Sequence, residues 1–253
     1  MAPARQDRTR RVGFIGRGRL AAGVARAIAD GGVPGWEVGA ALARDGRERA
    51  FPGPVLTDRA AFFGSGLDLI IEAGGPQALV EFGPEALVAA DLWTISASAL
   101  ADPAFYERME RIGAETGHRL RLVAGAFGGM DAVAALATLP GTTVTFAATW
   151  TGDDASKPAV RETASAREIV SRHRGVNALA AAAIAGVGLD ATRIDYAGEG
   201  PGGLRVLAVE ATGPGGTYAG RSTPTVDPQA GAQMVVGSLV AALRNETRVI
   251  WCG

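Results

Sequence analysis

Residues 11–32 read RVGFIGRGRLAAGVARAIADGG and contain the pattern on which the fold assignment depends. A short apolar run, residues 12–15, leads directly into the glycine pair Gly16 and Gly18, and a segment with apolar side chains at helical spacing follows over residues 20–29. A strand that passes through a glycine turn into a helix is typical of a parallel sheet covered by helices. The same glycines can also form nothing more than a tight turn, so the sequence around them matters.

Short apolar runs alternate with helix-period segments from residue 11 to about residue 122. This alternation predicts an α/β domain with a doubly wound parallel sheet. We expect strands over residues 12–15, 36–42, 67–73, 91–96 and 119–123, and helices over residues 20–29, 76–90 and 102–116.

The pattern changes after residue 123, where the glycine-rich turn GAFGGMDA precedes an apolar helix and residues 142–150 alternate with period two. A helix over residues 177–185 and strands over 192–196, 204–211 and 217–221 predict an α+β domain with an antiparallel sheet. We place the domains at residues 1–124 and 125–226. A last helix, with Asp227 as N-cap and Pro228 at its first position, lies within residues 227–253 and is expected to pack back on the first domain.

Composition excludes several classes of function. The formal net charge is -1 and the basic residues are scattered, which disfavours a nucleic-acid partner. No apolar run reaches the roughly 18 residues that a membrane span needs. The chain has 1 cysteine, Cys252, and 2 histidines, too few for a disulfide framework or a usual zinc site, so we expect no metal. A cytoplasmic protein with a small-molecule ligand is the expectation.

Gly16, Gly18 and Ala21 match the spacing of the fingerprint for binding a dinucleotide. Gly16 permits the tight turn, and Gly18 lets the backbone approach a pyrophosphate. Amides at the helix N-terminus, where Arg19 and Leu20 lie, favour that anion. The side chain that follows strand 36–42 determines whether NAD or NADP is preferred. Here it is Arg44, whose guanidinium can pair with the 2′-phosphate of NADP. The alternative is a solvated Arg44, with Asp45 on the ribose of NAD.

Four segments together resemble the L-aspartate dehydrogenase family. They are IIEAGGPQAL (residues 70–79), TISASALADP (94–103), GAFGGMDA (125–132) and SAREIVSRHRGVNALAAAAIAGVG (165–188). The resemblance implies a Rossmann domain, a second α+β domain for substrate and dimerisation, and a homodimer. It also implies hydride transfer between the nicotinamide and the Cα of an amino acid, through an imine that water can hydrolyse.

On the matched positions, the resemblance implies that Ala73, Ser96, Ala126 and Asn177 contact the ribose and nicotinamide and that Asp131 lies at the domain junction. The alternative for Asn177 and Asp131 is that each only caps a helix.

The catalytic histidine of the family has no counterpart in residues 194–216, where Arg205 or Val206 occupies its position. His173 is the candidate replacement, because like-charge repulsion from Arg172 and Arg174 would favour its neutral form; the alternative is an ordinary surface histidine. The loss leaves three functions open: aspartate dehydrogenase, imine reductase or dehydrogenase for another substrate, and an NAD(P)-binding sensor or subunit without turnover. Cations that could anchor a dicarboxylate substrate are Lys157, Arg172, Arg174, Arg205 and Arg221.

Overall fold

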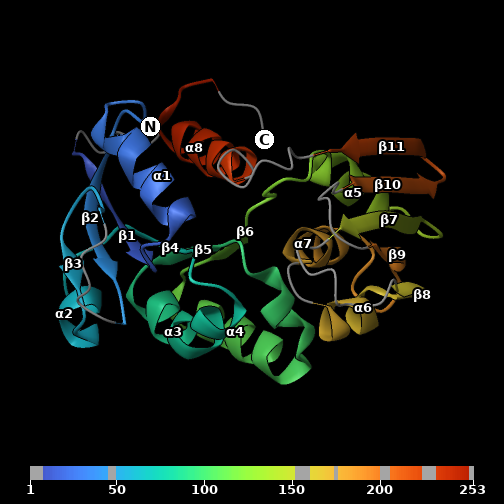
Figure 1. Cartoon of the computed structure of the whole chain (residues 1–253), viewed down its shortest axis with the longest axis horizontal. Helices are drawn as coiled ribbons and strands as arrows, with labels where there is room; N and C mark the ends of the chain where they lie inside the picture. The colour runs from blue at the N-terminus through green and yellow to red at the C-terminus, as the bar shows by residue number, and fades with distance from the viewer. Residues whose placement is uncertain are drawn as a thin grey trace. The chain divides into compact units, whose positions relative to one another are not determined.

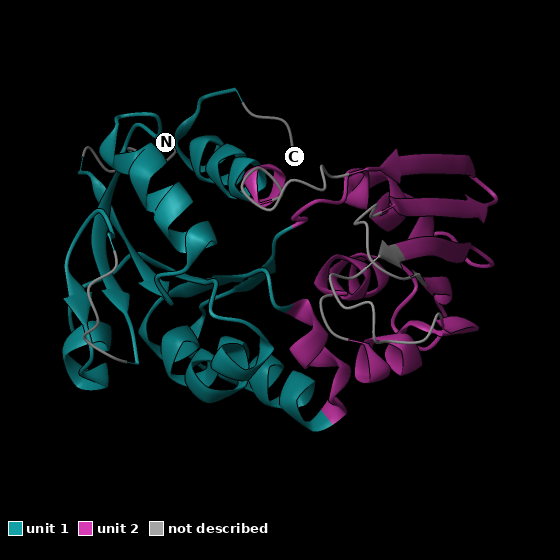
Figure 2. Cartoon of the chain, in the orientation of Figure 1, with its two compact units in different colours: residues 1–96, 104–123, 236–253 teal, residues 97–103, 124–235 magenta. Residues whose placement is uncertain are grey.

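The structure is a computed structural model that describes residues 8–44, 50–151, 160–173, 176–199, 206–223 and 232–250. The chain forms two compact units, which Figure 2 shows in separate colours. Unit 1 comprises Met1–Ser96, Ala104–Val123 and Val236–Gly253, and unit 2 comprises Ala97–Pro103 and Ala124–Val235. Each unit therefore contains more than one segment of the chain.

Unit 1 contains a 6-stranded sheet in the order β3-β2-β1-β4-β5-β6. Its strands are β1 (Arg10–Ile15), β2 (Trp36–Leu42), β3 (Val55–Leu56), β4 (Leu69–Glu72), β5 (Asp91–Thr94) and β6 (Leu120–Leu122), and every pair is parallel. This is the doubly wound Rossmann order, so the predicted fold class is confirmed. The order reverses between β1 and β4, and ligands of such folds bind at the carboxyl ends of the strands at this point.

Helices cover the two faces of this sheet, as Figure 1 shows. They are α1 (Arg19–Ala29), α2 (Arg59–Phe63), α3 (Pro76–Ala89), α4 (Pro103–Thr116) and α8 (Gln233–Thr247). Residues such as Val12, Phe14 and Ile71 are fully buried. Strands between two layers of helices have no solvent-facing side, which explains why they appear in the sequence as continuous apolar runs.

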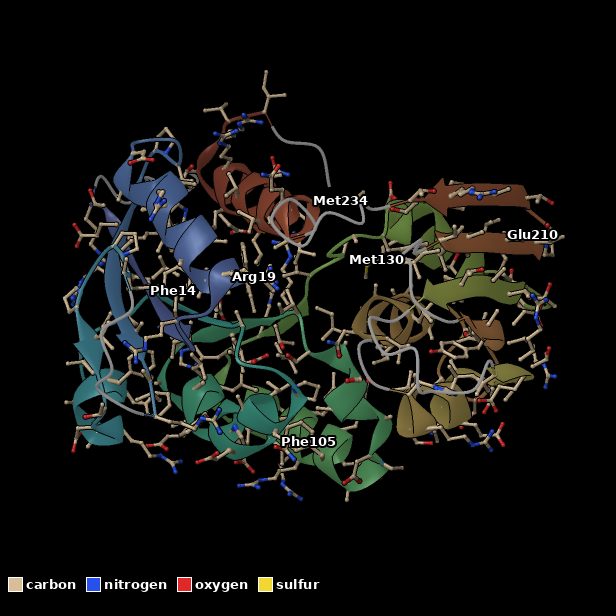
Figure 3. The ribbon with its side chains drawn as sticks, viewed as in Figure 1. Phe14, Arg19, Phe105, Met130, Glu210 and Met234 are labelled. Carbon is tan, nitrogen blue, oxygen red and sulfur yellow. The ribbon has the colours of Figure 1, made fainter. Side chains whose placement is uncertain are left out.

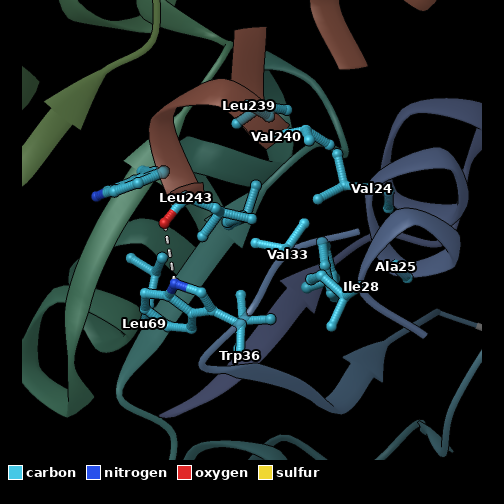
Figure 4. Packing of buried hydrophobic residues seen from close by; sticks show 14 of the residues in the cluster. Val24, Ala25, Ile28, Val33, Trp36, Leu69, Leu239, Val240 and Leu243 are labelled. Atoms are coloured by element: carbon cyan, nitrogen blue, oxygen red, sulfur yellow. Dashed lines mark hydrogen bonds between the residues drawn. The ribbon is translucent and has the colours of Figure 1, made fainter. Parts of the chain in front are cut away.

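The late helix α8 packs into the core of unit 1. Figure 4 shows Leu239, Val240 and Leu243 of α8 facing Val24, Ile28 and Val33, and all six belong to one buried apolar cluster. The indole Nε1 of Trp36 donates a hydrogen bond to the Leu243 carbonyl at 3.1 Å. The expected cap residues Asp227 and Pro228 lie outside the described residues.

Unit 2 contains a 5-stranded sheet in the order β11-β10-β7-β9-β8. Its strands are β7 (Thr143–Thr151), β8 (Val160–Ser165), β9 (Arg193–Glu199), β10 (Val206–Gly213) and β11 (Gly216–Ser222). The prediction of an antiparallel sheet is wrong for one pair, because β7 and β9 run parallel. The connection between them contains β8 and two helices, and this length allows a parallel return.

One face of this second sheet is covered by helices. Along β7, Val144, Phe146 and Ala148 are buried, whereas Thr143 and Thr145 are exposed. The covering helices are α5 (Met130–Ala137), α6 (Ala166–Arg172) and α7 (Asn177–Ala185), and the 3₁₀-helix η1 (Ala97–Ala101) packs on α6 and α7. A capping box begins α6, since the Ser165 side chain and the Glu168 side chain each bond to the other's backbone amide.

Candidate functional site

The turn after β1 requires glycine at its first position. Gly16 has φ +93°, and a β-carbon there would lie 3.1 Å from the Gly74 Cα. Its amide donates to the carbonyl of Leu42, the last residue of β2, at 2.9 Å. A side chain at position 16 would be strained by this φ and would also meet backbone, so the turn requires glycine. With glycine there, the ends of β1, β2 and β4 lie in close contact.

The N-terminus of α1 follows directly. Gly18 is its N-cap, with extended backbone angles and no side chain of its own to cap the helix, and the first turn carries no acidic residue. A β-carbon on Gly18 would meet no atom of a described residue within 4 Å. Arg19, labelled in Figure 3, and Leu20 begin the helix. The first amides of a helix lack intrahelical acceptors, so this end suits an anion.

A buried carboxyl group lies at the end of the neighbouring strand β4. Glu72 is 0 % exposed. Its Oε1 accepts hydrogen bonds from the amides of Gly74 and Gly75, each at 2.7 Å, and its Oε2 accepts one from the Thr94 hydroxyl at 2.6 Å. Burial raises the pKa of Glu72, and the donors only partly counteract this effect. Glu72 was not predicted as a site residue, although a charged residue at the end of a buried strand is a recognisable signal.

Two predicted cofactor residues lie beside this carboxyl group. Ala73 follows Glu72, and its amide donates to the Ile15 carbonyl at 3.0 Å. The Ser96 amide donates to Thr94 Oγ1 at 2.9 Å. The Ser96 hydroxyl is buried and makes no hydrogen bond of normal geometry to any described residue. It nevertheless lies close enough to help lower the pKa of Glu72. Ser96 therefore faces the protein interior.

Arg44 lies two residues beyond the end of β2, and it is exposed. It lies at the carboxyl edge of the sheet, and its role at the ribose stays a prediction. Asp45 lies outside the described residues, so the structure does not bear on the alternative that uses it.

Asn177 begins α7, whose N-cap is Val176. The alternative that Asn177 is only a helix cap is therefore wrong. Its Oδ1 accepts hydrogen bonds from the Ser98 amide at 3.2 Å and from the Ser98 hydroxyl at 2.5 Å. Because a backbone amide can only donate, the oxygen of the carboxamide must be the atom that faces Ser98.

The glycine-rich loop that carries Ala126 is attached to β11. The Ser222 hydroxyl donates to the Ala126 carbonyl at 2.5 Å, and the Tyr218 hydroxyl approaches the Gly128 carbonyl at 3.5 Å. Gly129 has φ +86° and is the N-cap of α5, so the cap alternative for Asp131 is wrong: it lies in the first turn.

His173 follows α6 and contacts the strands of unit 2. Its Nε2 lies 2.5 Å from Glu162 Oε1, and its ring stacks on Tyr196 with the centroids 4.0 Å apart. The His173 hydrogen bond is the largest cause that lowers the pKa of Glu162. The expectation of a cationic environment is wrong, because a carboxylate touches the ring and Arg172 is itself paired with Glu162 at 2.6 Å. The His173 side chain is 19% exposed, so it is partly buried, and the alternative of an ordinary surface histidine stays open.

Few of the expected substrate cations can be located. Arg221 is exposed on β11. Arg174, Arg205 and Lys157 lie outside the described residues. Within the described ranges, no group of three or more His, Cys, Asp or Glu side chains could hold a metal ion, and no helix is both long and apolar enough to cross a membrane.

Comparison with known proteins identifies the relatives of this chain. The family model described as homoserine dehydrogenase, NAD binding domain, matches residues 16–123. L-aspartate dehydrogenase from Ruegeria pomeroyi is 30% identical over 95% of this chain and 94% of its own length. L-aspartate dehydrogenase 2 from Bordetella pertussis is 32% identical over 74% of this chain and 77% of its own. The chain belongs to the L-aspartate dehydrogenase family.

A solved structure of aspartate dehydrogenase from Thermotoga maritima shares this fold. Its TM-score is 0.77 at 19% identity, and the match covers 96% of this chain and 99% of that one. The protein is thus an oxidoreductase of the L-aspartate dehydrogenase type with an NAD(P)-binding domain, as the resemblance implied.

The described residues of unit 1 fit the pyrophosphate that an L-aspartate dehydrogenase must hold. A β-carbon on Gly16 would close the turn, whereas the space over Gly18 is open and the N-terminus of α1 has no acidic neighbour in its first turn. These are the properties that a phosphate-binding helix start requires.

Proposed function

We propose that the protein is an NAD(P)-dependent dehydrogenase that interconverts an amino acid and its imine, with aspartate and iminosuccinate as the first substrate pair to test. The observation that carries the proposal is the Gly16 turn, which packs against Gly74 where the strand order reverses and leads into the open end of α1. The relatives named L-aspartate dehydrogenase supply the substrate class.

In this proposal two groups of residues bind the dinucleotide. The backbone amides at the start of α1 bind the pyrophosphate, because they lack intrahelical acceptors and the macrodipole favours negative charge. The pyrophosphate residues are Gly16, Gly18, Arg19 and Leu20, and the ribose and nicotinamide residues are Ala73, Ser96, Ala126 and Asn177. Ser96 contributes through its backbone, since its hydroxyl is covered.

We propose NADP as the preferred cofactor. The exposed guanidinium of Arg44 follows β2, where a planar donor can pair with a 2′-phosphate. NAD is the alternative, and a comparison of turnover with both nucleotides decides between them.

When bound, the nicotinamide supplies the hydride acceptor or donor. The protein's own part is orientation and proton transfer. Holding the substrate Cα against the ring removes an entropic barrier, which is worth several kcal/mol, roughly 7–11 in well-oriented systems. Asn177, whose Oδ1 is occupied by Ser98, offers its Nδ2 as a donor to the reacting groups.

His173 is our candidate for moving the proton that forms or breaks the carbinolamine. A carboxylate that accepts from one imidazole nitrogen orients the ring, as Glu162 is placed to do. Because Nε2 faces Glu162, only Nδ1 can exchange a proton with substrate.

A second candidate function follows from one observation. The chain has only 2 histidines, and neither lies within residues 194–216 where the family's catalytic histidine belongs. Reducing a protonated imine needs less acid–base assistance than releasing ammonia, so an imine reductase or dehydrogenase for a non-aspartate substrate is the alternative. A sensor or subunit that binds NAD(P) without turnover, the third function that the sequence left open, has no observation in its favour.

One experiment distinguishes these functions. Purified protein is mixed with NADPH or NADH and assayed with oxaloacetate plus ammonia, and then with a panel of keto acids, amines and cyclic imines. Oxidation of NADPH or NADH with oxaloacetate and ammonia supports aspartate dehydrogenase. Oxidation of the nucleotide only with imines supports the reductase. Nucleotide binding in calorimetry, without oxidation by any substrate of the panel, supports the sensor.

We also propose a homodimer that works in the cytoplasm, on the basis of the family resemblance and the composition. Light scattering during size-exclusion chromatography measures the mass directly. A monomer at micromolar concentration contradicts the dimer.

A further inference from the structure

A carboxyl group, Glu72, is buried at the carboxyl end of β4, next to β1 in the sheet and at the point where the strand order reverses. Burying a carboxyl group is unfavourable unless its oxygens are hydrogen-bonded. Glu72 belongs to none of the residue sets assigned above to cofactor or substrate.

Three donors surround the Glu72 carboxyl group. The amides of Gly74 and Gly75 can only donate, so Oε1 accepts both, at 2.7 Å each. The Thr94 hydroxyl accepts from the Ser96 amide at 2.9 Å and donates to Oε2, 2.6 Å away. The carboxyl group thus connects the turn after β4 to the end of β5.

The turn that Glu72 holds supports the glycine turn of the dinucleotide site. The Cα and N of Gly74 would lie 3.1 and 3.2 Å from a β-carbon on Gly16. On its other side, a β-carbon on Gly74 would lie 2.8 Å from the Cβ of Ala78 in α3. Gly74 is confined between α3 and Gly16, so a shift of this turn changes the space in which Gly16 lies.

We propose that Glu72 is a positioning residue for the dinucleotide: its Oε1 fixes the Gly74–Gly75 turn, and that turn fixes Gly16 at the entrance to α1. This inference rests on the proposed dinucleotide binding. Glu72 does not touch the dinucleotide in this scheme, and it acts through the two amides that it accepts.

The test uses Glu72→Met, which keeps the length of the side chain and removes both acceptor oxygens, and Glu72→Gln, which keeps one oxygen for the two amides. Calorimetry measures the Kd of NADPH and NADH for each protein. Hydrogen exchange by NMR measures the Gly74 and Gly75 amides without nucleotide. We expect E72M to raise the Kd about tenfold, as loss of a hydrogen-bonded support does, and to speed exchange at both amides. E72Q should restore most of the affinity and protection.

Two further measurements keep the inference testable if E72M does not fold. The first is Gly74→Ala, which leaves Glu72 intact but pushes the turn away from α3, and it should also weaken binding. The second is the exchange of the two amides in the unaltered protein, which should be slow. Glu85→Gln, on the exposed end of an ion pair with Arg59, is the matched control and should bind as the unaltered protein does.

Each outcome has one meaning. An E72M protein that folds and binds either nucleotide with unaltered Kd overturns the role of Glu72 and leaves the proposed function standing. Rapid exchange of the Gly74 and Gly75 amides in the unaltered protein also overturns the role of Glu72 and leaves the proposed function standing. If the unaltered protein binds neither nucleotide, the proposed function fails, and the positioning role fails with it.

Discussion

The carboxamide oxygen of Asn177 accepts hydrogen bonds from both the amide and the hydroxyl of Ser98, 79 residues earlier in the chain. The contact orients a side chain at the start of α7 from the 3₁₀-helix η1. Since the oxygen is occupied, the nitrogen is the part of the carboxamide left to serve a ligand.

Asn177→Asp therefore tests the donor. The carboxylate can still accept both bonds from Ser98, so the fold should be retained and Tm should stay close to that of the unaltered protein. Replacing a donor by an acceptor should lower kcat/KM about tenfold or more. Ser98→Ala is the companion variant, and it should have a smaller effect because the Ser98 amide still orients the oxygen. Unchanged kinetics in N177D would remove Asn177 from the site.

Gly16→Ala and Gly18→Ala form a matched pair. Alanine at position 16 meets the Gly74 backbone and a φ of +93°, so G16A should cost about 1–2 kcal/mol in the free energy of unfolding and also weaken nucleotide binding. Alanine at position 18 meets no atom within 4 Å, so G18A should unfold as the unaltered protein does and weaken nucleotide binding alone. Chemical denaturation and calorimetry measure the two effects separately. A G18A protein with unaltered affinity argues against pyrophosphate at this helix.

Arg44→Ala should weaken NADPH about tenfold and leave NADH unchanged, because a charge-assisted pair to a phosphate is worth roughly 1.5–3 kcal/mol. The Kd ratio for the two nucleotides is the measurement, and NADH serves as the internal control. A strong preference for NADH that survives the substitution contradicts NADP as the natural cofactor.

The Glu162–His173 contact predicts a pH effect with a definite sign. The lowered pKa of Glu162 means that the folded state favours the carboxylate more than the unfolded state does. The resulting stability is present above the ordinary value of 4.5 and is lost as the pH falls through the lowered folded value. Denaturation at pH 7 should show Glu162→Gln to be less stable than the unaltered protein, and the difference should shrink below about pH 4.5. A stability difference between the two proteins that does not change with pH would contradict a stabilising ion pair at Glu162.

His173→Ala separates proton transfer from packing. If His173 moves the proton, H173A should lower kcat. Its Tm should be close to the Tm of Glu162→Gln, the variant that alters the other partner of the same contact. If the pair only attaches α6 to β8 and β9, H173A lowers Tm and keeps full turnover, which removes His173 from the catalytic residues. A pH–rate profile of H173A checks the first outcome, because the limb due to this group should disappear.

The sequence predicted most of the elements where the chain has a strong local pattern. The bounds expected for residues 36–42 and 177–185 coincide with β2 and α7. β8 was missed because VRETAS is mostly polar and Ala164 is its one buried residue, so it has no apolar alternation. The parallel pairing of β7 with β9 was missed because neighbours in a sheet are chosen by tertiary packing.

The candidate site was predictable only where the motif is contiguous. Gly16 and Gly18 stand in one short turn whose chemistry follows from the absence of a side chain. Glu72 acts through partners up to 22 residues away, and Asn177 is oriented by a residue 79 positions earlier. No spacing rule predicts such contacts, since they arise when elements far apart in the sequence come together in the fold.

The return of α8 to unit 1 affects how the protein is made. Trp36 and Leu243, which are joined by a hydrogen bond, are 207 residues apart. A ribosome that adds roughly 5–20 residues per second needs about 10–40 seconds to go from Trp36 to Leu243. The nucleotide-binding unit therefore lacks α8 until all of unit 2 has been synthesised. Leu243→Ala, at a fully buried position, should cost about 2–5 kcal/mol, whereas Leu139→Ala, at a partly exposed one, should cost less. A nascent chain stalled before α8 should capture no nucleotide, although it already carries the whole glycine motif.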